Sequence, residues 1–420
     1  MGVSGAMSGQ QANDLVGEKA QVGWAPILTI WFFGALAGAG LGKTIPLVGM
    51  VIKLYGAPPS QAPWFISIVT IASVVLAPFG GWLIDRFGER RILVLSCLID
   101  ILGNLIVIAA GSFAAVMVGR VVEGFGFTGL LVAGTAMMVR VTRGAQRNIA
   151  MTLWGASVPI GVGIAEALSS TLTDGVFQRP FWAHAAALLV GLALVGALPR
   201  LPKAVSPRDA FGMFDIYRYS GAVRMGAALT AVVAAQFGIA AMFPQFLKIA
   251  YDQPIEIAGS IGAASIALGV LGSIGAGVLL NKKMSALTLG LTAVALVGAG
   301  GGLTFAPNIG VALSSLMFLL CSIGAGAAIG LGFAMVPVVA PSPAAYGAAG
   351  ALCNQLVNLG FVIGPPAAFS ALHADTRVGP IALAVGGALL AALLLPKATL
   401  RSGHSTQGHG GDFEVHQTAD

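Results

Sequence analysis

The sequence predicts an all-α polytopic membrane protein with twelve transmembrane helices arranged as two six-helix bundles. Three observations lead to this fold class. Hydrophobic residues make up 57% of the 420 residues and charged residues only 9%, whereas soluble domains carry about 25% charged residues. The apolar residues gather in long runs separated by short polar segments, and the second half of the chain repeats short motifs of the first. A water-soluble fold of this size could not bury so many apolar side chains.

The apolar runs define the expected membrane spans. A helix needs roughly 20 apolar residues to cross the hydrocarbon core of a bilayer. Twelve such runs are expected near residues 25–51, 62–84, 91–111, 113–138, 149–173, 181–199, 223–247, 256–280, 286–305, 310–336, 345–371 and 378–396.

A polar, proline-containing segment near the middle of the chain divides the spans six and six. No charged segment followed by an apolar one opens the chain, so no cleaved signal peptide is expected. The Gly-, His- and polar-rich C-terminus is expected to be disordered. The expected organisation is a cytoplasmic N-terminal tail (1–24), an N-terminal bundle (25–199), a cytoplasmic linker (200–222), a C-terminal bundle (223–396) and a disordered cytoplasmic tail (397–420).

The distribution of Lys and Arg predicts the orientation. With the N-terminus in the cytoplasm, sixteen of the 22 basic residues fall on the cytoplasmic side, and Lys43 and Arg120 lie inside spans. The remaining four fall on the other side: Lys53, Arg179, Lys248 and Arg377. The positive-inside rule therefore predicts an N-in, C-in protein, and the compact loops favour a bacterial inner membrane. Because the net charge of +6 follows from this bias, no nucleic-acid partner is expected.

An internal repeat supports the two-bundle architecture. Three matches share an offset close to 200 residues: 81–86 with 277–282, the Gly-x-Gly of 124–126 with that of 324–326, and Pro46 with Pro244. In this alignment, Leu320 and Ile323 stand where the first half has Arg120 and Glu123. A duplicated six-span unit places a substrate site at the interface between the halves.

The segment 81–91, Gly-Trp-Leu-Ile-Asp-Arg-Phe-Gly-Glu-Arg-Arg, joins the second and third spans. Such a charged cluster belongs at a membrane surface. It resembles the signature loop of the major facilitator superfamily, Gly-x-Leu-x-Asp-Arg-x-Gly-Arg-Arg, in which Glu89 replaces a basic residue. The resemblance implies a conformational latch made by Gly81, Asp85, Arg86, Gly88, Arg90 and Arg91.

A second motif lies in the fourth span, at residues 119–126. It resembles the Arg-x-x-Gln-Gly-x-Gly motif of the same superfamily, in which the arginine faces a central cavity. Glu123 replaces the glutamine and adds a titratable group beside Arg120. Together with residues 153–161, the segment also resembles the cyanate and nitroimidazole porter branch of the superfamily.

Charged residues within spans are the main candidates for function, because each is costly in hydrocarbon. Lys43, Arg120, Glu123 and Glu166 are expected at similar depths on spans one, four and five, whereas Asp100 is expected to be structural. Two buried cations favour an anionic or strongly polar substrate, and the two acids could carry a coupling proton. Alternatively, the four charges pair only to make their burial tolerable.

Uncharged polar residues are weaker candidates. The following could line a central cavity or make ordinary interhelical contacts: Trp154, Gln236, Asn354, Gln355 and Asn358. No metal site is expected, because the spacing of His404, His409 and His416 fits no compact ligand set. No phosphate-binding loop for ATP occurs either, so no cofactor is expected.

The sequence thus predicts a monomeric secondary active transporter of a small polar or anionic organic solute, coupled to protons and working by alternating access. Two alternatives remain open. A drug/proton antiporter would share the fold but would need a wide apolar cavity. A membrane receptor or scaffold that has lost transport would typically carry a folded soluble domain, and none is expected here.

Overall fold

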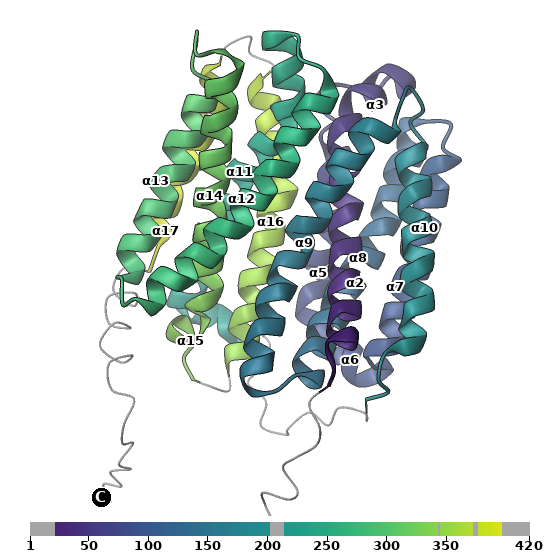
Figure 1. The fold of residues 1–420 in the computed structure, drawn as a ribbon, viewed down its shortest axis with the longest axis vertical. Coiled ribbons are helices and arrows are strands. Elements are labelled where there is room, and N and C mark those ends of the chain that lie inside the picture. Colours follow the sequence, from purple (N-terminus) through teal and green to yellow (C-terminus); the bar gives the residue numbers. More distant parts are fainter. Residues whose placement is uncertain (1–21, 202–213, 343–344, 373–376, 397–420) are drawn as a thin grey trace, which may run out of the picture.

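The computed structural model describes residues 22–201, 214–342, 345–372 and 377–396, and these residues fold as helices and connecting turns. Two groups of helices lie side by side (Figure 1), the N-terminal half on the right and the C-terminal half on the left. We call the end where α3 lies the upper end, and the end where α6 and α15 lie the lower end. The expected disordered tail falls outside the described residues.

The N-terminal half forms the first six spans. Its elements are α2 (Trp24–Gly42), η1 (Ile45–Leu47), α3 (Val48–Tyr55), α4 (Trp64–Ser67), η2 (Ile68–Thr70), α5 (Ile71–Leu76), η3 (Ala77–Phe79), α6 (Gly80–Phe87), α7 (Glu89–Ile108), α8 (Phe113–Val141), α9 (Gly144–Leu172), α10 (Arg179–Leu194) and η4 (Val195–Ala197).

The C-terminal half repeats the arrangement with fewer breaks. Its elements are η5 (Asp215–Arg218), α11 (Ser220–Tyr251), α12 (Ile255–Asn281), α13 (Ala286–Thr304), α14 (Gly310–Ala334), α15 (Val336–Val339), α16 (Tyr346–Leu372) and α17 (Val378–Leu394).

The helices have the length and polarity of membrane spans. Nine helical stretches of the described chain are long and apolar enough to cross a bilayer, and the segments 64–76 and 378–394 are shorter apolar helices. The 29-residue helix α9 completes the set of twelve. Large apolar side chains such as Leu28, Val118 and Leu393 are more than half exposed, as expected of surfaces that face lipid. The twelve-helix fold class is confirmed.

The first two spans, expected as continuous helices over 25–51 and 62–84, are broken. At the end of α2 the amide of Thr44 bonds Leu41 O instead of continuing the α-helical pattern. Pro46 in η1 follows, and proline has no N–H to donate. The second span alternates between α-helix and 3₁₀ turns, the last of which contains Pro78. These breaks leave backbone carbonyls without their helical partners, and inside a bundle side chains must satisfy them.

The structure corrects the register of the internal repeat. A Cβ added to Gly103 of α7 would contact Glu123 N and Gly119 O of α8. In the second half, a Cβ added to Gly300 of α13 would contact the same two kinds of atom, on Cys321 and Met317 of α14. Glu123 therefore corresponds to Cys321.

It follows that Arg120 corresponds to Phe318, and the expected Leu320 and Ile323 are wrong by two residues. The alignment failed because it matched a Gly-x-Gly pattern, whereas helix contacts decide which glycine faces which neighbour.

Candidate functional site

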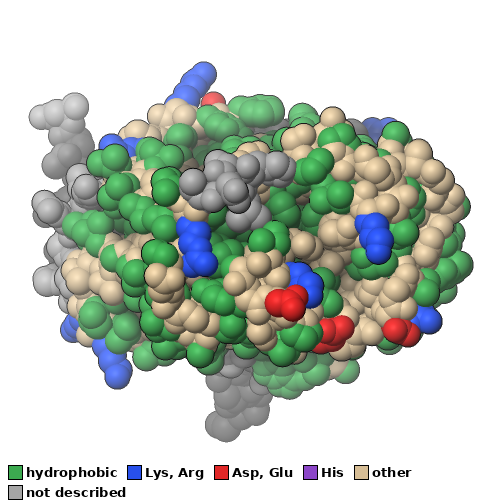
Figure 2. All heavy atoms as spheres, turned by 90° about the horizontal axis from the view of Figure 1, so that it is seen from above, with side chains coloured by type: hydrophobic (Ala, Val, Ile, Leu, Met, Phe, Trp, Pro, Cys, Tyr) green, Lys and Arg blue, Asp and Glu red, His purple; other side chains and the backbone are tan. Residues whose placement is uncertain are grey.

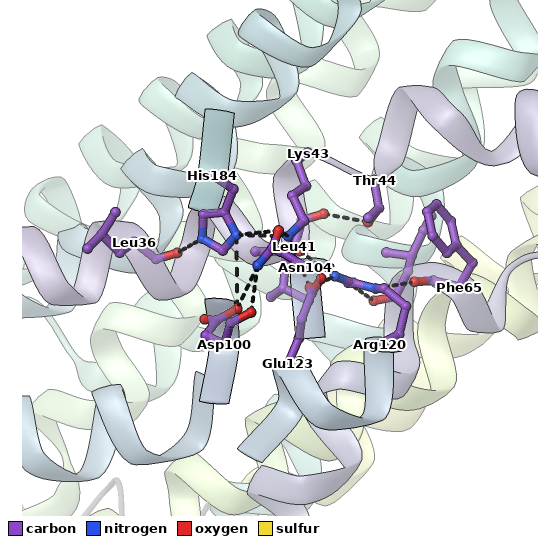
Figure 3. A network of polar contacts seen from close by, with 12 residues as sticks. Leu36, Leu41, Lys43, Thr44, Phe65, Asp100, Asn104, Arg120, Glu123 and His184 are labelled. Carbon is purple, nitrogen blue, oxygen red and sulfur yellow. Dashed lines mark hydrogen bonds and ion pairs between the residues drawn. The ribbon is translucent and has the colours of Figure 1, made fainter. Parts of the chain in front are cut away.

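A buried polar cluster occupies the interior of the N-terminal half (Figure 3). Four spans contribute its side chains, all at most 4% exposed: Lys43 from the end of α2, Asp100 and Asn104 from α7, Arg120 and Glu123 from α8, and His184 from α10. We call these six residues the polar cluster. Its two cations and two acids would cancel in charge, which makes such deep burial tolerable.

Lys43 lies at the centre of the polar cluster. Its ammonium donates to Asn104 Oδ1 at 2.6 Å, to His184 Nδ1 at 2.8 Å and to Glu123 Oε2 at 3.0 Å. An ammonium has three donors, and these acceptors use all of them. In this conformation Lys43 therefore has no donor left for a substrate.

Arg120 donates hydrogen bonds to backbone carbonyls at the breaks of both the first and the second span. Its guanidinium donates to Gly40 O at 3.0 Å, to Phe65 O at 3.0 Å and to Ile66 O at 3.4 Å. Gly40 is at the end of α2, and Phe65 and Ile66 precede the turn η2, so these carbonyls lie where regular α-helix stops. Arg120 also donates to Glu123 Oε2, one helical turn away.

The imidazole of His184 has a defined tautomer. Its Nε2 lies 3.0 Å from Leu36 O, and since a carbonyl only accepts, Nε2 carries the hydrogen. Nδ1 is then the acceptor for Lys43. Asp100 Oδ1 lies 4.0 Å from this Nδ1 and accepts from Asn104 Nδ2 at 3.2 Å. A proton added to Nδ1 would face Asp100.

Glu123 uses its two oxygens unequally. Oε2 accepts from both Lys43 and Arg120. Oε1 is buried and, among the described residues, has no hydrogen-bond partner. A buried polar atom without a partner is rare in folded proteins. This oxygen is therefore the position in the polar cluster where a proton or a water molecule would be accommodated.

Three of the four charged candidates, Lys43, Arg120 and Glu123, meet as the sequence suggests. Glu166 does not join them, because its carboxylate lies against Gly262 of α12 in the other half. Asp100, which was not expected to belong to this group, joins it, while its structural role stays a prediction. Its side chain enters the polar cluster because α7 packs directly on α8, where a Cβ on Gly126 would contact Asp100 Cβ at 2.6 Å.

Sequence reasoning missed Asn104 and His184. Both are single polar residues deep within otherwise apolar runs, which is the signal that could have revealed them. Asn104 follows Asp100 by one helical turn and shares its face. His184 lies four residues after Pro180, in the first turns of α10.

The uncharged candidates are dispersed. Trp154 is 9% exposed, and its ring packs against Gly34 and Gly134 inside the N-terminal half. Gln236 donates to Ser322 Oγ at 3.5 Å within the C-terminal half. Asn358 donates to Asn354 O at 2.9 Å, while its buried Oδ1 has no partner among the described residues. Whether these residues line a cavity stays a prediction.

Gln355 joins the two halves. Its Nε2 donates to Val74 O of α5 at 2.6 Å, and its Oε1 accepts from Tyr217 of η5. Four residues after Val74 stands Pro78, which has no N–H to complete the helical bond. Gln355 supplies the donor that Pro78 lacks.

The latch segment is described in part. Gly88 has φ 77°, a conformation that favours glycine, and Arg90 donates to Gly196 O of η4 at 3.1 Å. Glu89 forms an ion pair with Arg140 at the end of α8, which gives a reason for an acid at this position. The surroundings of Gly81 and the side chain of Asp85 fall outside the described part of the chain, as do His404, His409 and His416. The latch role of Gly81, Asp85, Arg86, Gly88, Arg90 and Arg91 stays a prediction.

Comparison with known proteins identifies the family. The family model of the Major Facilitator Superfamily matches residues 30–365. The chain therefore belongs to this superfamily of membrane transporters. Nothing in the match favours the cyanate and nitroimidazole branch.

Among curated proteins, the chain is similar to facilitated glucose transporter member 10 of Danio rerio, with 28% identity over 33% of this chain and 27% of that protein. It is also similar to multidrug resistance protein 2 of Bacillus subtilis, with 25% identity over 38% of this chain and 40% of that protein. The matches thus span less than half the length of these relatives.

Solved structures support the fold over most of the chain. A variant of the nucleoside transporter NupG has a TM-score of 0.70 at 14% identity, covering 90% of this chain and 99% of that one. A bacterial homolog of the human lysosomal transporter Spinster, inward-facing and occupied, also has a TM-score of 0.70, at 13% identity over 90% and 96% of the two chains.

Proposed function

We propose that this protein is a proton-coupled secondary transporter of a small polar organic solute. The observation that carries the proposal is the polar cluster. Above all, Glu123 Oε1 has no hydrogen-bond partner among the described residues, while Oε2 accepts from Lys43 and Arg120. A carboxyl that exchanges a proton at Oε1 changes the charge balance around Lys43 and Arg120. That change can favour one arrangement of the four contributing spans over another.

The contacts of the two cations refine the expected substrate. All donors of Lys43 are used within the polar cluster, and Arg120 is committed to three carbonyls and Glu123. An uncharged polar solute therefore fits this arrangement better than an anion, which would first have to displace Glu123. An anionic solute remains the alternative within the same proposal. The solute is expected between the halves, where major facilitator folds place it.

A drug/proton antiporter is the second candidate, supported by the similarity to multidrug resistance protein 2. A lipophilic cation would need an acid that is free of cations. Glu166, which has no ion pair among the described residues, is the acid that such a substrate could use.

The test is uptake by proteoliposomes containing the purified protein and a pH-sensitive dye. The probes are a hexose, a nucleoside, a carboxylate anion and a lipophilic cation. Proton movement with the hexose or the nucleoside is the expected result. Movement with the cation alone would favour drug antiport, and solute uptake with no proton movement would reject proton coupling.

We also propose that the lower end faces the cytoplasm. Basic residues described at the lower end outnumber those at the upper end. They are Arg86, Arg90, Arg91, Arg140, Arg143, Arg200, Arg218, Arg224, Lys282 and Lys283, against Lys53, Arg179, Lys248 and Arg377. Seen from the upper end (Figure 2), a few blue and red side chains lie among apolar ones, and some of them lie next to each other. Impermeant thiol labelling of a cysteine placed near residue 218 should fail from outside intact cells, and labelling there would reverse the orientation.

A further inference from the structure

Helices α9 and α12 form a contact between the halves near the upper end. They run antiparallel, and three pairs of residues meet in register: Gly163 with Ile266, Glu166 with Gly262, and Ser170 with Gly259. A Cβ added to Gly259 would lie 2.5 Å from Ser170 Oγ, and one added to Gly163 would lie 3.3 Å from Ile266. We call these three pairs the upper contact.

The upper contact does not continue toward the lower end. Gly155 precedes Glu166 by three helical turns and lies on the same face of α9. A Cβ added to Gly155 would meet no atom within 4 Å. The three contacts between these two helices therefore lie in their upper parts.

Glu166 is the unusual member of the upper contact. Its side chain is 2% exposed, and its carboxylate occupies the space that a side chain on Gly262 would fill. Within the described chain it makes no hydrogen bond or ion pair. An unpaired charge inside a membrane bundle costs several kcal/mol. While α9 touches α12 in this way, the neutral form of the carboxyl is therefore favoured.

No charged neighbour can take the place of that proton. Lys43, at the end of α2 beside α9, has its three donors committed to Asn104, His184 and Glu123. Glu256, in the first turn of α12, is exposed and acidic. The α12 residues of the upper contact, Gly259, Gly262 and Ile266, carry no charge.

We infer that Glu166 is a proton-operated gate residue of the upper contact, separate from the proton site proposed at Glu123. With its proton, Glu166 packs on Gly262 and holds α9 against α12. Without it, the carboxylate requires water, and the upper ends of the halves separate. The ligand of this site is a proton taken from the solution at the upper end.

The proposed gate also depends on the glycine at position 262. An alanine there would place its methyl group too close to Glu166 Oε1 for both to fit, so the carboxyl would have to leave this position in either protonation state. Gly262→Ala therefore serves as a control that displaces the carboxyl from its place on α12 at every pH. Glu166→Gln keeps the shape, cannot ionise, and should close the upper contact independently of pH.

The experiment measures the separation of the upper ends by pulsed electron paramagnetic resonance. Spin labels are placed at Val176, before α10, and at Val378, the start of α17. Both side chains are exposed, and these elements lie on opposite flanks of the molecule (Figure 1). The full chain is used in nanodiscs, with Cys97, Cys321 and Cys353 replaced, and no solute is needed.

We expect the distance between the labels to lengthen as the pH rises in the parent protein. It should stay short in Glu166→Gln at every pH, and Gly262→Ala, which displaces the carboxyl, should weaken the response. Glu123→Gln should keep the parent's pH response, which separates this inference from the proposed coupling role of Glu123. A pH response that persists in Glu166→Gln, or that is absent from the parent, would overturn the inference whether or not transport is proton-coupled.

Discussion

The two halves of the molecule share a helix arrangement but differ in chemistry at equivalent places. Where α7 and α8 hold Asp100 and Glu123, the corresponding contacts on α13 and α14 hold Val297 and Cys321. Where Arg120 binds three carbonyls, Phe318 stacks on Phe243 of α11, with ring centroids 4.3 Å apart.

The same contrast extends to the sixth helix of each half. His184 of α10 lies beside Asn104, with 3.3 Å between His184 Nδ1 and Asn104 Oδ1. In the second half, Gly301 stands at the place of Asn104, because Gly300 corresponds to Gly103. Its neighbour on α17 is Ala384, whose Cβ would lie 2.9 Å from a Cβ added to Gly301. Close helix packing alone therefore suffices for this architecture, and the polar cluster is an addition that the fold does not require.

The largest expected effect comes from removing Arg120. Arg120→Leu leaves Glu123 with one cation fewer and strands the carbonyls of Gly40, Phe65 and Ile66. Breaking a buried ion pair from one side typically costs about 3–5 kcal/mol. The matched change in the other half, Phe318→Leu, should cost about 1–2 kcal/mol. Thermal unfolding in detergent measures both, and equal losses in the two halves would contradict the contrast.

A smaller effect is expected for Asp100→Asn. The variant keeps the shape of the side chain and leaves the three acceptors of Lys43 in place, so most of the protein should fold. It removes one negative charge from the polar cluster and should shift the pH profile of solute uptake. Val297→Ala, at the equivalent place in the second half, should lower stability without moving that profile. An unchanged profile in Asp100→Asn would limit this acid to a structural role.

Particular residues show how much of this difference between the halves the sequence predicted. Composition and run length identified the twelve spans, because bilayer thickness fixes helix length. The charged candidates on spans one and four were identifiable because charges in hydrocarbon are rare. The sequence does not indicate which side of each helix faces the interior. Asp100 was therefore placed outside the group of charged candidates, and Glu166 inside it. Helix rotation and register depend on packing at individual glycines such as Gly103 and Gly300, which linear spacing does not reveal.

The smallest effect concerns the bond between the halves at Gln355. Gln355→Ala leaves Val74 O without the donor that Pro78 cannot supply. The bond from Tyr217 is lost as well, so the total loss should be about 1–2 kcal/mol, since each hydrogen bond contributes about 1 kcal/mol. Asn354→Ala on the same helix is the control, since the Asn354 side chain makes no hydrogen bond with the described residues. If both variants unfold at the parent temperature, the bond contributes nothing to joining the halves.

The central claim is that the proton work lies in the first half, at Glu123. Its most direct test compares Glu123→Gln with Cys321→Ser, the equivalent position of the second half, in proteoliposomes supplied with the transported probe. Glu123→Gln should still exchange solute across the membrane, because its shape is kept, yet fail to accumulate solute when a pH gradient is imposed. Cys321→Ser should do both. Accumulation by Glu123→Gln with the parent's pH dependence would contradict the account.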